Sequence, residues 1–154
     1  ALSNQASNDD LPALDGKVKE PLNRHLLQLF SIMQEGRFEF AYRTANEINR
    51  YMRVCQELTE TDDMEKWKTT GWEANFDEQI VQKILPKLHG SIGRIGKLIA
   101  ELAHFCHSPA STRKDSLGEI LNGLDSKARY PKSYTKLRSM AKTLSEEQFV
   151  SFIH

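Results

Sequence analysis

Apolar side chains recur at intervals of three and four residues along most of this 154-residue chain. That spacing places them on one face of an α-helix, whereas a half-buried strand alternates apolar and polar residues. The stripes are, in chain order, Leu22–Met33, Ala41–Cys55, Phe76–Ile84, Ile92–Cys106, Leu117–Leu124, Tyr134–Ala141, and Phe149 with Ile153 in a helix that begins at Ser145. We therefore predict an all-α fold, an irregular bundle of roughly six or seven helices with no strand.

Several residues predict where these helices begin and end. Pro21 suits a first helical turn, and Gly36 is typical of the position where a helix stops. Asn75 and Glu78 have the spacing of a capping box, in which side chains bond the free N–H groups of a helix start. Pro86 should end or bend the helix that follows, because its ring blocks the preceding turn.

Acidic residues dominate the interval between the second and third predicted helices. Residues 57–78 contain eight acids and two lysines, a composition typical of a loop. Trp67 and Trp72 predict that this loop is anchored to an apolar surface, either the core of this chain or that of a partner. The predicted organisation is a flexible segment 1–19, a first helical pair 20–58, an acidic loop 59–74 and a C-terminal helical part 75–154 of the same domain.

Charge and cysteine content limit the partners and the compartment. Lysine plus arginine and aspartate plus glutamate both total 21, so net charge indicates neither a polyanionic nor a membrane partner. Cys55 and Cys106 fall within apolar helical stripes, which favours two reduced thiols. No apolar run reaches the roughly 18 residues of a membrane span, and residues 1–10 lack the features of a signal peptide. We expect a cytoplasmic protein and, because the chain begins without methionine, a segment of a longer one.

The sequence offers no catalytic motif and no metal site. It contains no H-E-x-x-H, no G-x-S-x-G and no clustered Cys/His set. His104 and His107 share one helical face, but two ligands do not make a metal site. Residues 90–98 resemble a phosphate-binding loop, yet Leu98 stands where such a loop needs Ser or Thr. We predict no catalytic residue, no bound metal and no enzyme activity for this chain on its own.

One arginine occupies an unusual place. Arg43 lies in the first turn of the second predicted helix, where free N–H groups concentrate positive charge and a cation is unfavourable. A phosphate bound there would suit both the helix start and the guanidinium. The alternative is a solvated surface arginine, and the residue pattern leaves both interpretations open.

A second basic region lies near the C-terminal end. Residues 127–142 contain six basic residues, two tyrosines and no acid. Arg129, Lys132, Lys136 and Arg138 are therefore candidate contacts for nucleic acid or for an acidic partner. The alternative is a solvated helix face, which is the usual role of such charge runs.

Three segments resemble one protein family. They are Phe40–Tyr51, Phe76–Ser91, and Tyr130–Ser133 together with Lys136–Met140. These segments are similar to the C-terminal helical part of AAA+ NTPases of the McrB type, the motor subunits of restriction systems specific for 5-methylcytosine. The resemblance covers roughly residues 20–154 and implies a lid-like helical fold with a C-terminal helical extension.

The resemblance also implies a role for Arg43. In such lids an arginine at a helix start, called sensor 2, reaches the terminal phosphate of the nucleotide, and Arg43 occupies the matching position. Arg37 and Arg50 are weaker phosphate-facing candidates. The implied cofactor is ATP or GTP with Mg, held by the parent protein and not by this chain alone. The implied partners are an α/β nucleotide-binding core of the same polypeptide, further copies in a homo-oligomeric ring, a nuclease subunit and DNA, with no membrane.

The chain lacks the parts that phosphoryl transfer requires. It contains no P-loop and no acidic metal-binding strand, so the lid-like resemblance implies a segment that senses nucleotide without hydrolysing it. We expect such a lid to relay the state of the nucleotide within a ring. The alternative function is a helical module that binds protein or nucleic acid and has no nucleotide role.

Overall fold

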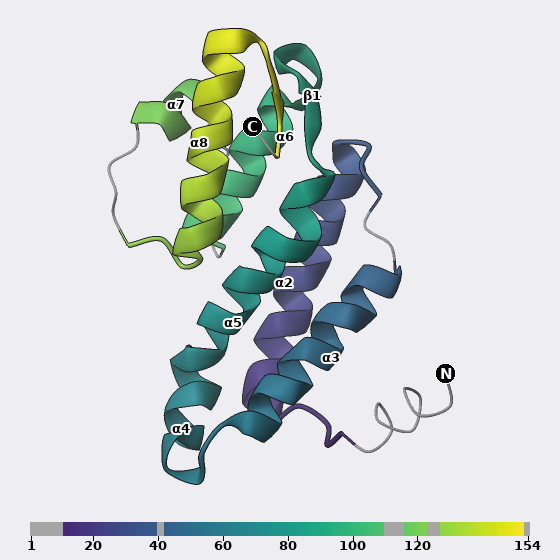
Figure 1. The fold of residues 1–154 in the computed structure, drawn as a ribbon, viewed down its shortest axis with the longest axis vertical. Coiled ribbons are helices and arrows are strands. Elements are labelled where there is room, and N and C mark those ends of the chain that lie inside the picture. Colours follow the sequence, from purple (N-terminus) through teal and green to yellow (C-terminus); the bar gives the residue numbers. More distant parts are fainter. Residues whose placement is uncertain (1–10, 40–41, 110–115, 123–126, 153–154) are drawn as a thin grey trace.

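Helices form nearly all of the described structure (Figure 1). The computed structural model describes residues 11–39, 42–109, 116–122 and 127–152 of the chain. The predicted all-α class is confirmed.

The described structure consists of helical elements and one small two-stranded sheet. In chain order they are α2 (Gly16–Glu35), α3 (Tyr42–Leu58), a 3-10 turn (Thr61–Asp63), α4 (Met64–Lys66), a π-helical segment (Trp67–Gly71), α5 (Trp72–Gln79), a second π-helical segment (Ile80–Ile84), a 3-10 turn (Leu85–Lys87), α6 (Ile92–His107), α7 (Leu117–Asn122) and α8 (Pro131–Glu147). Strands β1 (His89–Ser91) and β2 (Phe149–Ser151) pair antiparallel, with Gly90 opposite Val150. Helix α5 packs against α3 and α8, and α6 packs against α8. Figure 1 shows α3 on one flank of the molecule and α7 on the other.

Helix α2 begins earlier than predicted. The Asp15 carboxylate accepts a hydrogen bond from the Lys17 N–H at 2.9 Å and so caps the helix start. Pro21 therefore lies inside α2 and not in its first turn. Residues 16–19, which the sequence analysis assigned to a flexible segment, are helical. Residues 1–10 of that segment lie outside the described part of the chain.

The end of α2 lies at Gly36, as predicted. Arg37 follows in the left-handed region with a φ of 62°. The Arg37 N–H donates to the Gln34 carbonyl at 3.0 Å, and the Phe38 N–H donates to the Met33 carbonyl at 2.9 Å. These two bonds make a Schellman motif, which satisfies carbonyls that the helix end leaves free. A glycine usually occupies the left-handed position of this motif, and here an arginine occupies it.

The prediction of an acidic loop at 59–74 is wrong, because most of this segment is helical. Trp67 and Trp72 are only 7% and 2% exposed, and burying these large rings stabilises a helix despite the acids around them. Residues 64–84 form one continuous helical rod, made of α4, the two π-helical segments and α5. Asn75 lies inside this rod and accepts a hydrogen bond from the Trp67 indole N–H at 2.8 Å. The capping box predicted at Asn75 and Glu78 is therefore wrong, because Asn75 does not lie at a helix start. The rod ends in the 3-10 turn that contains Pro86, as predicted.

The prediction of no strand is wrong, and so is the final helix predicted to contain Phe149. Helix α8 ends at Gln148, which takes a left-handed φ of 66° and turns the chain back toward β1. The Gln148 carbonyl accepts a hydrogen bond from the Ile92 N–H at 2.9 Å, next to the strand pair. Gly90 in β1 has a φ of 145°, which side chains other than glycine rarely adopt. Ile153 lies outside the described residues.

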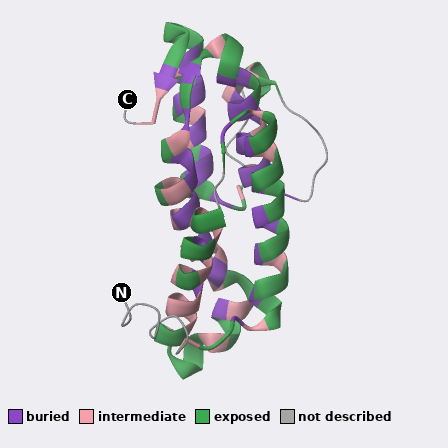
Figure 2. Cartoon of the chain, turned by 90° about the vertical axis from the view of Figure 1, so that its right-hand side faces the viewer, coloured by how far each residue is buried: buried purple, intermediate pink, exposed green. Residues whose placement is uncertain are grey.

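The core lies between the inner faces of the helices, which Figure 2 shows as buried. Ile95, Ile99 and Leu102 have no exposed surface, so the apolar stripe predicted for α6 faces the core. Leu137 and Leu144 of α8 are equally buried and belong to the same cluster. Packing of α6 against α8 thus holds the C-terminal part together.

An aromatic cluster joins α2, α5 and α6 to the start of α8. The His25 ring lies 5.5 Å from the Phe105 ring and 5.8 Å from the Tyr130 ring, both edge to face. The His25 Nδ1 and the Tyr130 hydroxyl share a hydrogen bond of 2.6 Å. Burial lowers the pKa of His25 to about 4, with help from the charges of Arg129 and Arg24, and burial raises the pKa of Tyr130. His25 is therefore neutral inside the fold at physiological pH.

Candidate functional site

Arg43 lies in the first turn of α3, directly after the first helical residue, Tyr42. Its side chain is 89% exposed. The first N–H groups of any α-helix lack partners within the helix, so this end is electropositive before the guanidinium is added. The predicted position of Arg43 in a first helical turn is confirmed. Phe40 and Ala41 lie outside the described residues.

A carboxylate on the next turn of α3 contacts Arg43. The Glu47 Oε1 lies 3.5 Å from the Arg43 Nε, and the Glu47 Oε2 lies 3.1 Å from the Lys83 Nζ. Lys83 belongs to the second π-helical segment, so Glu47 connects α3 to the rod that contains α5. One carboxylate is thus shared by two cations.

The exposed face of α3 is hollowed around Arg43. The hollow has a volume of about 410 Å³ and is lined by Tyr42, Arg43, Asn46, Glu47, Asn49, Arg50 and Arg53. Three guanidinium groups and two amides supply many donors, while the single carboxylate already contacts Lys83. This arrangement suits an anionic ligand rich in acceptor oxygens, such as a phosphate.

Of the two weaker phosphate-facing candidates, Arg50 lies at the hollow and Arg37 does not. Arg50 lines the hollow with Arg43, because the two residues lie two turns apart on one helical face. Arg37 follows α2 and does not line the hollow. Arg53 also lines the hollow, and its guanidinium donates a hydrogen bond to the Leu11 carbonyl at 3.5 Å. Arg53 was not predicted as a site residue, although its spacing of three residues from Arg50 places both on one helical face.

Trp67 and Trp72 belong to the core of this chain. Both are buried, and Trp72 stacks on Phe76 with ring centroids 6.3 Å apart. The sequence left open whether these rings pack on the core of this chain or on a partner, and the structure places them in the core of this chain. As buried rings they do not form a surface for a partner.

Two candidates of the basic region are paired with acids of α5. Arg129 forms an ion pair with Glu73, and the Lys132 Nζ lies 2.8 Å from the Glu78 Oε1. This ion pair raises the pKa of Lys132 and lowers the pKa of Glu78. Part of the positive charge of residues 127–142 is therefore neutralised within the chain.

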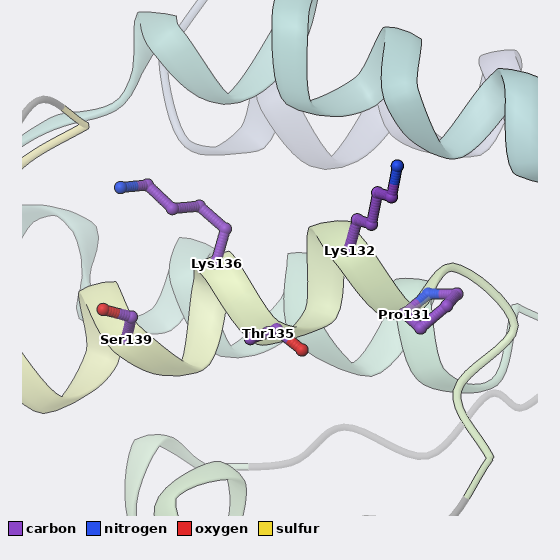
Figure 3. A pocket seen from close by; sticks show the side chains of 5 residues that line it. All are labelled: Pro131, Lys132, Thr135, Lys136 and Ser139. Atoms are coloured by element: carbon purple, nitrogen blue, oxygen red, sulfur yellow. The ribbon is translucent and has the colours of Figure 1, made fainter.

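The other two candidates of the basic region lie against aromatic rings. The Lys136 ammonium is 4.6 Å from the centroid of the Phe152 ring, and the Arg138 guanidinium is 5.8 Å from that of Tyr134. Figure 3 shows Lys132 and Lys136 on the same side of α8. A hollow of about 540 Å³ on this helix is lined by Pro131, Lys132, Thr135, Lys136 and Ser139.

Metal, thiol and membrane features were also predicted from the sequence. Among the described residues, no group of three or more His, Cys, Asp or Glu side chains is arranged to hold a metal ion. Cys55 and Cys106 are both free, and burial raises the pKa of each thiol. Within the described ranges, no helix combines the length and the apolar character needed to cross a membrane.

The fold and the α3 surface together define an all-α helical bundle with an arginine-rich hollow on one exposed helix. The family model that matches residues 2–149 describes a domain of unknown function, DUF8727, and the chain belongs to this family. No curated protein and no solved structure matches the chain. The family description assigns no activity.

Proposed function

We propose that this chain is the helical lid of an AAA+ nucleoside triphosphatase of the McrB type. In this proposal the lid docks on an α/β nucleotide-binding core of the same polypeptide, and Arg43 contacts the terminal phosphate of ATP or GTP bound there with Mg. The lid then relays the state of the nucleotide to other copies in a ring. A nuclease subunit and DNA are partners of the parent protein in the same proposal.

The placement of Arg43 carries this proposal. Its guanidinium is 89% exposed at the electropositive start of α3, and it lines a hollow with Arg50 and Arg53. Concentrated positive charge at an exposed surface is unfavourable by itself, and a phosphate relieves it. The Glu47 contact at 3.5 Å is too long and too exposed to remove that preference.

The all-helical fold and the segments that resemble McrB-type lids support the same function. One of these segments, Phe76–Ser91, forms the end of α5, the second π-helical segment, the 3-10 turn Leu85–Lys87 and β1. It supplies Lys83, which contacts Glu47 beneath Arg43. One residue of this segment, Lys83, therefore contacts the carboxylate that neighbours Arg43.

The test is nucleotide hydrolysis by the full polypeptide that joins this chain to its core. The Arg43→Ala replacement should lower kcat/KM for nucleotide hydrolysis by about 5- to 150-fold, the range expected for one charged contact to phosphate. Arg24→Ala, which removes an exposed arginine from α2, is the matched control and should leave hydrolysis unchanged. Equal hydrolysis by the Arg43→Ala variant and the control would discard the proposed role.

The hollow on α8 favours a second candidate function, a module that binds duplex DNA. Its polar lining consists of two ammonium groups and two hydroxyl groups, which are typical contacts to phosphodiester oxygens. The Lys132 ammonium would have to exchange its exposed contact with Glu78 for a phosphate. This function needs no nucleotide.

Salt dependence of DNA binding tests the second candidate. If Lys132 and Lys136 contact phosphates, replacing both with Gln should reduce the slope of log K against log salt by about 0.9 per lysine. Lys19→Gln with Lys97→Gln removes two exposed lysines elsewhere and is the matched control. Binding that is absent, or unaffected by the α8 double replacement, would remove this candidate.

A further inference from the structure

We propose that Glu47 is the resting counter-ion of Arg43 and competes with the nucleotide phosphate for it. The inference rests on the proposed function, because it assigns a regulator to the same site. Glu47 then lowers the affinity of the lid for nucleotide, and it links the occupancy of Arg43 to the helical rod through Lys83.

The geometry distinguishes the two cations that share Glu47. The Arg43 contact uses Oε1 at 3.5 Å, whereas the Lys83 contact uses Oε2 at the shorter distance of 3.1 Å. The Arg43 side chain is 89% exposed, while those of Glu47 and Lys83 are 43% and 40% exposed. Arg43 is therefore the member of the group that a ligand can draw away.

Phosphate and Glu47 can compete for the same donor atoms of Arg43. A guanidinium binds phosphate best through two parallel N–H donors, and the Arg43 Nε, which lies 3.5 Å from the Glu47 Oε1, belongs to one such pair. Two anions on one guanidinium also repel each other. A phosphate that takes the donor pair containing Nε therefore releases Glu47 from this contact and leaves it paired with Lys83.

Release of Glu47 from Arg43 couples the phosphate site to the rest of the fold through Lys83. Lys83 lies in the second π-helical segment, which continues α5, and α5 packs against both α3 and α8. A stronger contact between Glu47 and Lys83 in the nucleotide-bound state changes how α3 is attached to this rod. In this proposal the same carboxylate modestly lowers the affinity for nucleotide, and its contact with Lys83 changes when Arg43 is occupied.

A double-mutant cycle on the full polypeptide tests the inference. The variants are Glu47→Gln, Arg43→Gln and the combination, and the probes are non-hydrolysable ATP and GTP analogues with Mg. Removing the competitor should tighten nucleotide binding roughly two- to five-fold, as expected for loss of an exposed ion pair. In the Arg43→Gln background the same replacement should have no effect, because the competition acts through Arg43.

Two further variants sharpen the cycle. Lys83→Gln leaves Glu47 with Arg43 as its only partner, so nucleotide binding should weaken by about two-fold. Glu57→Gln removes an exposed glutamate from the same helix and should leave the affinity unchanged. Circular dichroism and unfolding curves confirm that each variant is folded before its affinity is compared.

The outcomes separate this inference from the proposed function. If Arg43→Gln weakens binding but Glu47→Gln leaves it unchanged, the competitor role is wrong and the nucleotide role of Arg43 stands. If Glu47→Gln tightens binding equally in both backgrounds, it acts by general charge and the competitor role is again wrong. If Arg43→Gln leaves the affinity unchanged, both proposals fail.

Discussion

Asp77 and Ser133, 56 positions apart, are joined by hydrogen bonds between α5 and the start of α8. The Asp77 carboxylate accepts the Ser133 N–H at 2.9 Å and the Ser133 hydroxyl at 2.6 Å. It also accepts the Lys132 N–H at 2.8 Å. Tyr130 precedes the helix and makes no side-chain cap, so a carboxylate from another helix performs that function.

Removal of this carboxylate should destabilise the fold. Asp77→Ala leaves two N–H groups of a largely buried helix start without an acceptor, and we expect a loss of about 2–4 kcal/mol in the free energy of unfolding. Denaturant unfolding measures the loss. Asp62→Ala removes an exposed aspartate and should change stability by less than about 0.5 kcal/mol. Equal stability of the two variants would show that Asp77 does not hold α8.

The buried His25 predicts acid sensitivity. The pKa of a free histidine is about 6.5, whereas desolvation lowers that of His25 to about 4. Between these values the unfolded chain binds the proton more readily than the folded chain, so stability falls as pH falls through this window. The full loss is on the order of 3 kcal/mol.

Unfolding curves between pH 4 and 7 check the role of His25. The His25→Gln variant should be less stable at neutral pH but should lose this part of the pH dependence. His89→Gln removes an exposed histidine and should keep it. An unchanged pH dependence in His25→Gln would place the titrating group elsewhere.

Arg37 predicts a stabilising replacement. Its φ of 62° is unfavourable for a residue with a Cβ atom, whereas glycine adopts it freely. Arg37→Gly should therefore raise the free energy of unfolding by about 0.5–1 kcal/mol, measured by thermal or denaturant unfolding. Glu39→Gly, two residues later, lacks this relief and should not stabilise the protein. A loss of stability in Arg37→Gly would contradict the account of the α2 end.

Trp72 distinguishes a core role from a partner role. It is 2% exposed, so Trp72→Ala should lower the free energy of unfolding of the isolated chain by about 3–5 kcal/mol. Leu58→Ala truncates a side chain that is 76% exposed and should cost little. If the Trp72→Ala and Leu58→Ala variants are equally stable, Trp72 does not stabilise the core and a role in binding a partner is favoured.

Local periodicity predicted the helices that carry a complete apolar stripe. The stripe of α6 is the best example, because every third or fourth residue from Ile95 to Cys106 enters the core. The segment containing Trp67 and Trp72 was predicted wrongly because its helix depends on burial against distant elements, and the local composition favours a loop. The strand pair was missed for a similar reason, since β1, in the middle of the chain, pairs with β2 near the C-terminal end.

The candidate site was predictable in part. The position of Arg43 follows from the helix pattern, and the shared face with Arg50 follows from helix geometry. The contact between Glu47 and Lys83 joins two separate elements, so no spacing along the chain indicates it. The pairing of Asp77 with the start of α8 is of the same kind.

Equilibrium binding of nucleotide to the full polypeptide tests the central claim most directly. Calorimetric titration with a non-hydrolysable triphosphate analogue compares the native protein with its Arg43→Ala variant. If Arg43 contacts the terminal phosphate, the variant should bind the triphosphate about 5- to 150-fold more weakly, while its affinity for the diphosphate should be nearly unchanged. Equal loss for both nucleotides, or no loss for either, would contradict a contact to the terminal phosphate.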